Sequence, residues 1–117
     1  AAEVFEKDFF DLTKHKDITG YLRSLKRKQA LVGGCETDVC VLQSCLGLIN
    51  LGYEVFVIED LLFSSSRDVS AAVERLKAEG AVFVSIKTLY YELLEAVESS
   101  PQRKKIVENH GPFPLEI

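Results

Sequence analysis

Four consecutive apolar residues, Val-Phe-Val-Ile at positions 55–58, lie between two longer segments with helical periodicity, and this alternation recurs along the chain. A short apolar run of this kind is typical of a parallel strand that is covered on both faces. We expect buried strands at residues 29–34, 54–59 and 81–86, and helices at residues 18–28, 38–51, 67–79 and 88–98. Strands that alternate with helices predict an α/β fold, here a three-layer α/β/α sandwich with a mainly parallel sheet.

Capping and turn residues set the expected ends of these elements. Asp17 is the predicted N-cap of the first helix, and Ser65 or Ser66 that of the third. Asp60 is expected to end the second strand, so that residues 61–66 form a loop. Val4 lies in a possible strand end just before Lys7.

Length and composition restrict the class of protein. The chain has 117 residues, the size of one domain, and its 47% hydrophobic and 27% charged residues exclude intrinsic disorder. Its net charge of −4 is opposite to that of a typical nucleic-acid binder. No apolar run approaches the ~20 residues of a membrane helix, and the first ten residues lack the apolar stretch of a signal peptide. We therefore expect a soluble, cytoplasmic protein that binds neither nucleic acid nor membranes.

The three cysteines, Cys35, Cys40 and Cys45, are spaced five residues apart. An odd number of cysteines argues against a disulfide framework, and this spacing does not match the usual zinc ligands. His15 and His110 are remote in sequence, so no metal site and no cofactor are expected. Cys35 and Cys45 are predicted to be small buried hydrophobic residues.

Cys40 follows a turn that joins an expected strand to an expected helix, Gly-Gly-Cys-Glu-Thr-Asp-Val-Cys-Val at residues 33–41. With Thr37 as the N-cap, Cys40 falls in the first helical turn, where free N–H groups and the helix dipole favour a thiolate. The N–H groups of Glu36 and Cys40 are placed to receive an oxyanion. On these grounds alone Cys40 is a candidate nucleophile, and a structural role is about as frequent for a cysteine at such a position.

The stretch GGCETDVCVLQSCLGLINLGYEVFVIEDLLFSSS resembles the central signature of the isochorismatase-like cysteine hydrolases, a superfamily that includes nicotinamidases and isochorismatases. The residues that carry the resemblance are Gly34, Thr37, Cys40, Val41, Gly52, Tyr53, Val55 and Asp60. The similarity extends from about Val4 to about Val97. The short spacing between Lys7 and Phe10 is closest to the subgroup related to the MAR1 ribonuclease.

The resemblance implies a mechanism for the cleavage of small-molecule amides or esters through an acyl-enzyme. Cys40 would be the nucleophile and Lys7 its electrostatic partner. A cis peptide bond between Cys35 and Glu36, after the Gly34 turn, would aim the N–H groups of Glu36 and Cys40 at one point and form the oxyanion hole. Phe10 and Phe63 are candidates for a pocket that holds a flat ligand, although we expect core packing for both.

The family's catalytic aspartate and its metal ligands lie upstream of the lysine, and no residue at a matching position is present here. The family's sheet also places its first two strands between the lysine strand and the cysteine strand. We therefore expect the chain to be the C-terminal part of a longer protein whose upstream half is unresolved or carried by another chain. Residues 1–98 would belong to the hydrolase domain, and residues 99–117 would form a tail.

Two alternatives remain open at this point. The absent aspartate is compatible with a catalytically inactive binding protein that uses its apolar helix at residues 38–51 for oligomerisation. A redox sensor that uses Cys35, Cys40 or Cys45 is the weaker alternative. For the enzyme, the expected partners are a small-molecule substrate and further copies of the same chain.

Overall fold

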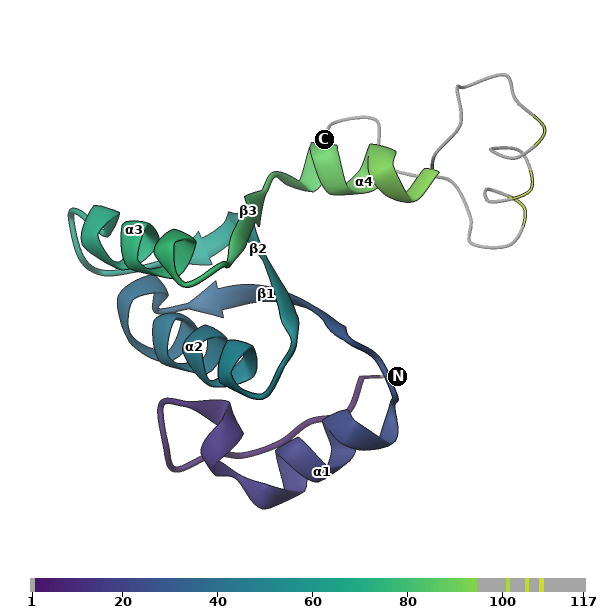
Figure 1. Cartoon of the computed structure of the whole chain (residues 1–117). Helices are drawn as coiled ribbons and strands as arrows, with labels where there is room; N and C mark the ends of the chain where they lie inside the picture. The colour runs from purple at the N-terminus through teal and green to yellow at the C-terminus, as the bar shows by residue number, and fades with distance from the viewer. Residues whose placement is uncertain (1, 95–100, 102–104, 106–107, 109–117) are drawn as a thin grey trace. The chain divides into compact units, whose positions relative to one another are not determined.

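The computed structural model describes residues 2–94 and, singly, Pro101, Lys105 and Glu108 (Figure 1). The predicted C-terminal tail, apart from these three positions, lies outside the described residues. The chain divides into two compact units, residues 1–83 and 84–117. The elements of the first unit are η1 (Leu12–Lys14), α1 (Lys16–Ser24), β1 (Gln29–Cys35), η2 (Thr37–Val41), α2 (Leu42–Asn50), β2 (Glu54–Phe63), α3 (Ser70–Ala78) and the start of β3 (Val82–Val84). The second unit contains α4 (Ile86–Leu94).

The predicted α/β fold is confirmed, because the strands form one sheet with helices packed against it. The strand order is β1-β2-β3, and β1 and β2 are parallel. Their register pairs Gln29 with Glu54 and Val32 with Val57, then shifts so that Cys35 pairs with Phe63. The carboxyl end of β1 therefore lies beside the carboxyl end of β2.

The prediction that β2 ends at Asp60 and that a loop follows is wrong, since the strand continues to Phe63. The irregular register keeps the end of β1 paired with the extra residues of β2. Gly33 allows this close approach, because a Cβ atom at that position would lie 3.0 Å from the Cβ atom of Leu61.

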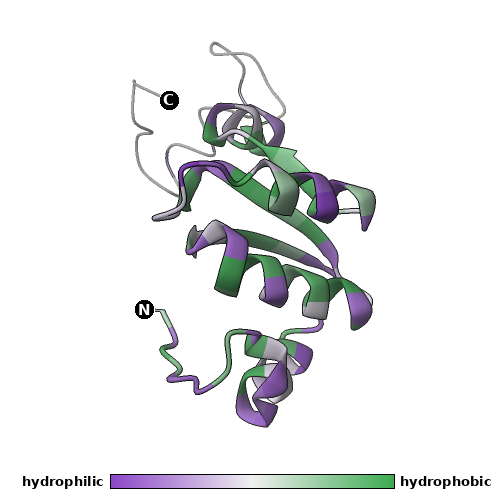
Figure 2. Ribbon diagram, turned by 90° about the vertical axis from the view of Figure 1, so that its left-hand side faces the viewer, coloured by the Kyte–Doolittle hydropathy of each residue, from purple (hydrophilic) through white to green (hydrophobic). Residues whose placement is uncertain are grey.

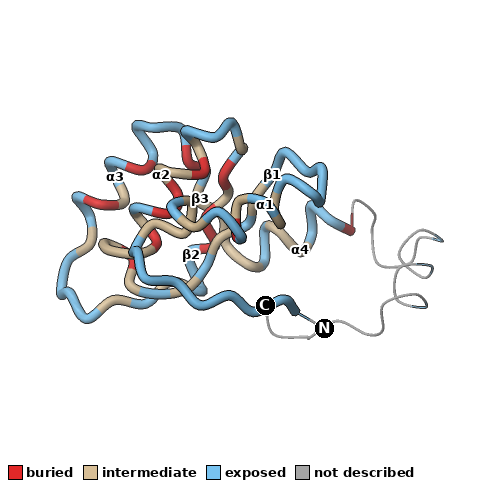
Figure 3. The backbone as a smooth tube through the Cα atoms, turned by 90° about the horizontal axis from the view of Figure 1, so that it is seen from below, coloured by how far each residue is buried: buried red, intermediate tan, exposed pale blue. Residues whose placement is uncertain are grey.

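The hydrophobic core lies between α2, α3 and β2. Its buried members are Val41, Cys45, Leu48, Val55, Val57, Leu76 and Ala81. Figure 3 shows buried positions gathered on these elements, while α1 and the N-terminal segment are mostly exposed. Figure 2 shows the corresponding apolar colouring along β2 and α2. Burial of each large apolar side chain contributes about 1.5–3 kcal/mol, so this core fixes the helix that follows Cys40.

The prediction that the outer strands are buried is wrong. Leu31 in β1 is 53% exposed and Val82 in β3 is 48% exposed. Each strand has a neighbour on one side only among the described residues, and this explains their exposure. Val4 is also exposed and belongs to no strand, which corrects the expected strand before Lys7.

The helix ends differ from the predicted caps. The N-cap of α1 is His15, so Asp17 lies inside the first turn instead of preceding it. The helix ends at Ser24, because Lys26 adopts a positive φ of 54°. In α3 the N-cap is Val69, and the Asp68 carboxylate accepts a 2.9 Å hydrogen bond from the Ser70 N–H.

Candidate active site

Cys40 lies in the turn that follows the carboxyl end of β1, which is the usual position of a site in a parallel sheet. The thiol is free and half-buried. The turn, η2, is π-helical: the N–H groups of Val39 and Val41 both donate to the Glu36 carbonyl oxygen at 3.1 Å. Cys40 therefore lies in the first turn of a helical segment that continues directly into α2.

Thr37 is not the N-cap of this segment, which corrects the prediction. Glu36 has the extended backbone of a cap residue, and its carbonyl accepts the first bonds of the turn. Thr37 is only 2% exposed, and its hydroxyl donates to the Phe63 carbonyl oxygen at 3.3 Å. Its side chain thus attaches the Cys40 turn to the end of β2.

The predicted cis peptide bond between Cys35 and Glu36 is present. Gly34, just before it, has a φ of 127°, which favours glycine. Cys35 is exposed, so the expectation that it is buried is wrong; it lies at the end of the edge strand β1. Cys45 is fully buried as predicted, and burial raises the pKa of its thiol to about 11.

Three serines after β2 hold the two carboxylates beside Cys40. The Ser65 hydroxyl and N–H donate to Glu36 Oε1 at 2.6 and 2.8 Å. The hydroxyls of Ser64 and Ser66 donate to Asp38 at 2.7 and 2.6 Å. We call Ser64–Ser66 the serine clamp. Its serines are therefore not helix caps, which corrects the prediction for Ser65 and Ser66.

The clamp changes the acidity of both carboxyl groups. Hydrogen bonds from the Ser65 hydroxyl and then the Ser65 N–H lower the pKa of Glu36. Those from Ser66 and then Ser64 lower the pKa of Asp38. Both groups are therefore ionised acceptors near neutral pH, and neither is poised to take a proton from Cys40.

Lys7 lies in an exposed segment without regular secondary structure and not at the end of a strand. Its ammonium group donates to the carbonyl oxygens of Phe9 and Phe10 at 3.0 and 3.1 Å. No hydrogen bond or ion pair joins Lys7 to Cys40 in the described part of the chain. The link between them is indirect and passes through α2, where Ser44 is bonded to the Phe10 carbonyl.

Phe10 and Phe63 are 59% and 63% exposed. Core packing, the role expected for both, is therefore wrong. Phe63 pairs with Cys35 across the sheet, and the carbonyl of Phe10 is bonded to Ser44. Their main chains are thus tied to the two elements that flank Cys40, the end of β1 and the helix α2.

A hollow of about 340 Å³ lies beside η2, the turn that contains Cys40. It is lined by Thr37, Glu59, Leu62, Ser64, Ser66, Val69, Val73 and Phe83. Its lining combines serine and threonine hydroxyls with apolar side chains, which is the usual character of a small-molecule site. Cys40 is not among the lining residues.

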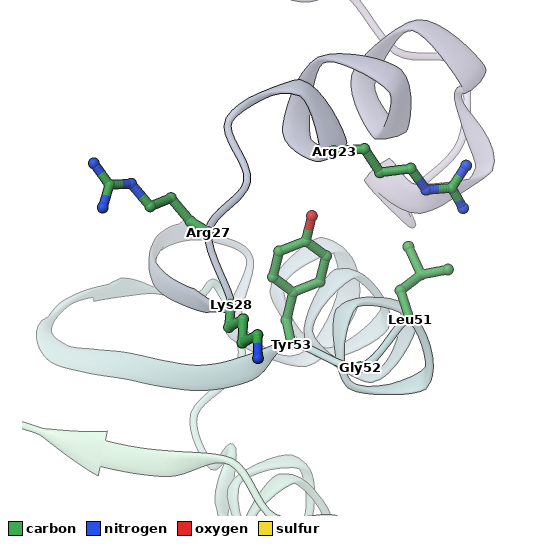
Figure 4. A pocket seen from close by; sticks show the side chains of 6 residues that line it. All are labelled: Arg23, Arg27, Lys28, Leu51, Gly52 and Tyr53. Atoms are coloured by element: carbon green, nitrogen blue, oxygen red, sulfur yellow. The ribbon is translucent and has the colours of Figure 1, made fainter.

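A second hollow lies at the amino ends of β1 and β2, away from Cys40 (Figure 4). Arg23, Arg27 and Lys28 contribute to it around Tyr53. In Figure 4 the guanidinium groups of Arg23 and Arg27 point away from the Tyr53 ring, so they do not converge on a common ligand position. The described residues contain no group of three or more side chains placed to hold a metal ion.

Reasoning from the sequence missed Ser44, His15 and the serine clamp. Ser44 is a lone hydroxyl in an apolar helix and is only 4% exposed. A polar residue among so many apolar ones signals a hydrogen-bonded role, so the sequence did carry a signal for Ser44. The partners of the clamp are 26–29 residues away, so local patterns do not predict them.

A parallel sheet, a cysteine at the carboxyl end of a strand and a cis peptide bond before it agree with the resemblance noted in the sequence. The model of the isochorismatase domain matches residues 1–88. This chain belongs to the isochorismatase family.

Two curated relatives support this assignment. The secreted isochorismatase effector Isc1 of Phytophthora sojae is 38% identical over 89 residues, which are 73% of this chain and 42% of the relative. Isochorismatase family protein 2A of Dictyostelium discoideum is 32% identical over 108 residues, 90% of this chain and 53% of the relative. The chain thus spans about half the length of these relatives.

Solved structures share the fold. The MAR1 ribonuclease of Caenorhabditis elegans superposes with a TM-score of 0.73 at 24% identity, covering 97% of this chain and 59% of that one. The nicotinamidase of Staphylococcus aureus superposes with a TM-score of 0.62 at 26% identity, covering 66% of this chain and 49% of that one.

Among the described residues, no helix combines the length and apolar character that crossing a bilayer requires. One relative is described as secreted, and the cytoplasmic location stays a prediction.

Proposed function

We propose that this chain carries the nucleophile of a hydrolase that cleaves a small-molecule amide or ester bond. The observation that carries the proposal is the position of Cys40. Its half-buried free thiol lies in the first helical turn after the carboxyl end of β1, directly after the cis peptide bond. The relationship to the nicotinamidase of Staphylococcus aureus supports a small amide as the substrate class.

In the proposed reaction the Cys40 thiolate attacks the carbonyl carbon of the substrate. The negative charge passes to the carbonyl oxygen, which the N–H groups of Glu36 and Cys40 would stabilise as an oxyanion hole. The carbon–nitrogen or carbon–oxygen bond then breaks, the amine or alcohol leaves with a proton, and a thioester remains on Cys40. Water hydrolyses the thioester, which releases the carboxylic acid and restores the thiol.

The remaining roles follow from the surroundings of Cys40. Lys7 would supply positive charge beside the thiolate, and Phe10 and Phe63 would flank a flat substrate with their exposed rings. Both nearby carboxylates are held by the serine clamp, so the family resemblance assigns the general base to an aspartate upstream of Lys7. Association with further copies of the same chain remains part of the proposal.

The test uses the protein with the upstream segment that would carry the general base. It measures the release of ammonia or acid from a panel of primary amides and simple esters, starting with nicotinamide. Cys40→Ala should abolish turnover, because no other described thiol lies in the turn after β1. Circular dichroism should show an unchanged fold. Ser24→Ala, on an exposed face of α1, is the control and should retain full activity.

The competing hypothesis is an inactive binding protein, and one observation favours it: within the described residues, no hydrogen bond or ion pair joins Lys7 to Cys40. Alkylation by iodoacetamide separates the two hypotheses. An activated Cys40 should react near pH 7 much faster than the same cysteine in the urea-unfolded chain. Reaction at the unfolded rate would favour the binding protein and overturn the enzyme proposal. Turnover that persists in folded Cys40→Ala would overturn the assignment of Cys40 as the nucleophile.

A further inference from the structure

We propose that Ser44 is the positioning residue that fixes Lys7 relative to Cys40. This inference rests on the proposed function, because it assigns Lys7 a role beside the nucleophile. Lys7 belongs to a loop of residues 7–15, which we call the Lys7 loop. This loop lies far from Cys40 in sequence, and the structure shows how it is attached to the helix that follows the nucleophile.

Ser44 forms two hydrogen bonds with the Lys7 loop. Its hydroxyl accepts from the Leu12 N–H at 3.0 Å and donates to the Phe10 carbonyl oxygen at 3.1 Å. The side chain is only 4% exposed, so both bonds are shielded from water. A serine hydroxyl has one proton to donate and can accept as well, and here both capacities are used.

The Phe10 carbonyl oxygen connects Ser44 to the lysine. This one atom accepts both from the Ser44 hydroxyl and from the Lys7 ammonium group, each at 3.1 Å. Ser44 follows Cys40 by four residues, which corresponds to about one helical turn and places both on the same side of the segment. A short chain of contacts therefore runs from the Cys40 helix through Ser44 and Phe10 to the positive charge.

The other hydrogen bonds of the loop join residues within it, and Leu12 also packs against the hydrophobic core. His15 Nε2 accepts from the N–H groups of Asp8 and Phe9 at 2.8 and 3.3 Å. Asp11 Oδ1 accepts from the N–H and the hydroxyl of Thr13 at 2.8 and 2.6 Å. These bonds hold the shape of the loop but do not reach α2.

Gly47 makes the close approach to α2 possible. A Cβ atom at this position would lie 2.6 Å from Asp11 Oδ1 and would also overlap the Thr13 hydroxyl. The helix α2 thus contacts the Lys7 loop through the Ser44 hydroxyl and, at Gly47, through its backbone, because glycine has no side chain. Two independent features of α2 fit the same loop.

The test measures the rate of Cys40 alkylation by iodoacetamide at pH 7 in the full chain, resolved by residue with mass spectrometry. It compares the unchanged protein with Ser44→Ala, Lys7→Met and the double variant. If the Lys7 ammonium group acts from about 4 Å in water, its attraction for the Cys40 thiolate is about 1 kcal/mol, which corresponds to about fivefold in the thiolate population. Each single variant should therefore slow alkylation about fivefold, and the double variant should be no slower than either.

Two further variants control for a merely structural effect. Ser44→Thr keeps a hydroxyl and should restore most of the rate, whereas Ser24→Ala removes an exposed hydroxyl that bonds only within α1 and should leave the rate unchanged. Gly47→Ala disturbs the same attachment from a second position. It should slow alkylation as Ser44→Ala does, and it provides the test if Ser44→Ala does not fold.

The outcomes separate this inference from the proposed function. If Lys7→Met slows alkylation but folded Ser44→Ala does not, the positioning role is wrong and the proposed function stands. If the effects of Ser44→Ala and Lys7→Met are additive, Ser44 acts on Cys40 by another route and the inference is overturned. If Lys7→Met has no effect, both the role of Lys7 and the inference fail.

Discussion

Gly47→Ala should destabilise this protein, although the same change inside a helix normally stabilises. Alanine is favoured over glycine in a helix by about 1 kcal/mol. At position 47, however, the new methyl group would lie 2.6 Å from Asp11 Oδ1 and would overlap the Thr13 hydroxyl. One of the two elements must therefore move.

The cost of this movement can be worked from the contacts of Asp11. Its side chain cannot turn away freely, because Oδ1 accepts two hydrogen bonds from Thr13. Loss of both bonds costs about 1 kcal/mol each, and an overpacked contact typically costs about 1–3 kcal/mol. After the helix gain of about 1 kcal/mol is subtracted, we expect a net loss of about 2–4 kcal/mol.

Urea unfolding followed by circular dichroism measures this difference. Gly20→Ala is the matched control, since it also lies inside a helix but a Cβ atom added there would meet nothing within 4 Å. The control should gain up to about 1 kcal/mol. If Gly47→Ala stabilises the chain as much as Gly20→Ala does, the close packing of the Lys7 loop on α2 is wrong.

Two further predictions concern pH and thiol chemistry. Hydrogen bonds lower the pKa values of Glu36 and Asp38 in the folded chain. These two groups therefore stabilise the fold at pH values above the carboxyl pKa of the unfolded chain, and this stabilisation is lost as pH falls through the lowered pKa of the folded chain. The urea midpoint of unfolding should therefore decrease between pH 7 and pH 3, and it should decrease less for Glu36→Gln. An equal dependence of the midpoint on pH in both proteins would contradict the role of the serine clamp. Burial raises the pKa of Cys45 to about 11, so iodoacetamide at pH 8 should label the exposed Cys35 but not Cys45 until urea unfolds the chain. Labelling of Cys45 as fast as Cys35 in the native protein, read by mass spectrometry, would refute its burial.

The parts of the fold that depend on local patterns were predictable. The run at residues 55–58 identified β2, and α2 and α3 each end shortly before a glycine with a positive φ, Gly52 and Gly80. The end of β2 was not predictable, because residues 61–63 are paired only through an irregular register with β1. The exposure of Leu31 and Cys35 depends on which strands surround β1, and no pattern within the strand encodes its neighbours.

The candidate site also combines features that local patterns predict with features that depend on distant residues. The position of Cys40 in the turn after β1 was predicted from the local strand–turn–helix pattern, and its role as a nucleophile stays a prediction. The cis peptide bond before Glu36 was expected from the family resemblance. The choice between Thr37 and Glu36 as the cap depended on a distant partner, because the Thr37 hydroxyl is engaged by the Phe63 carbonyl. Long-range hydrogen bonds of this kind override a local capping preference.

Hydroxyl groups attach the separate segments of this site to one another. Ser44 joins the Lys7 loop to α2, Thr37 joins the Cys40 turn to β2, and Ser64–Ser66 hold Glu36 and Asp38. A hydroxyl can be buried at a lower cost than a charge, and it can both donate and accept at short range. Replacing these attachments with ion pairs would place more fixed charge around Cys40 and would make its reactivity depend on several charged groups. In the proposed function, neutral attachments leave the Lys7 ammonium group as a charge whose position depends on the bond between Ser44 and the Phe10 carbonyl oxygen. This is the physical reason to expect that one hydroxyl, at position 44, controls the effect of Lys7.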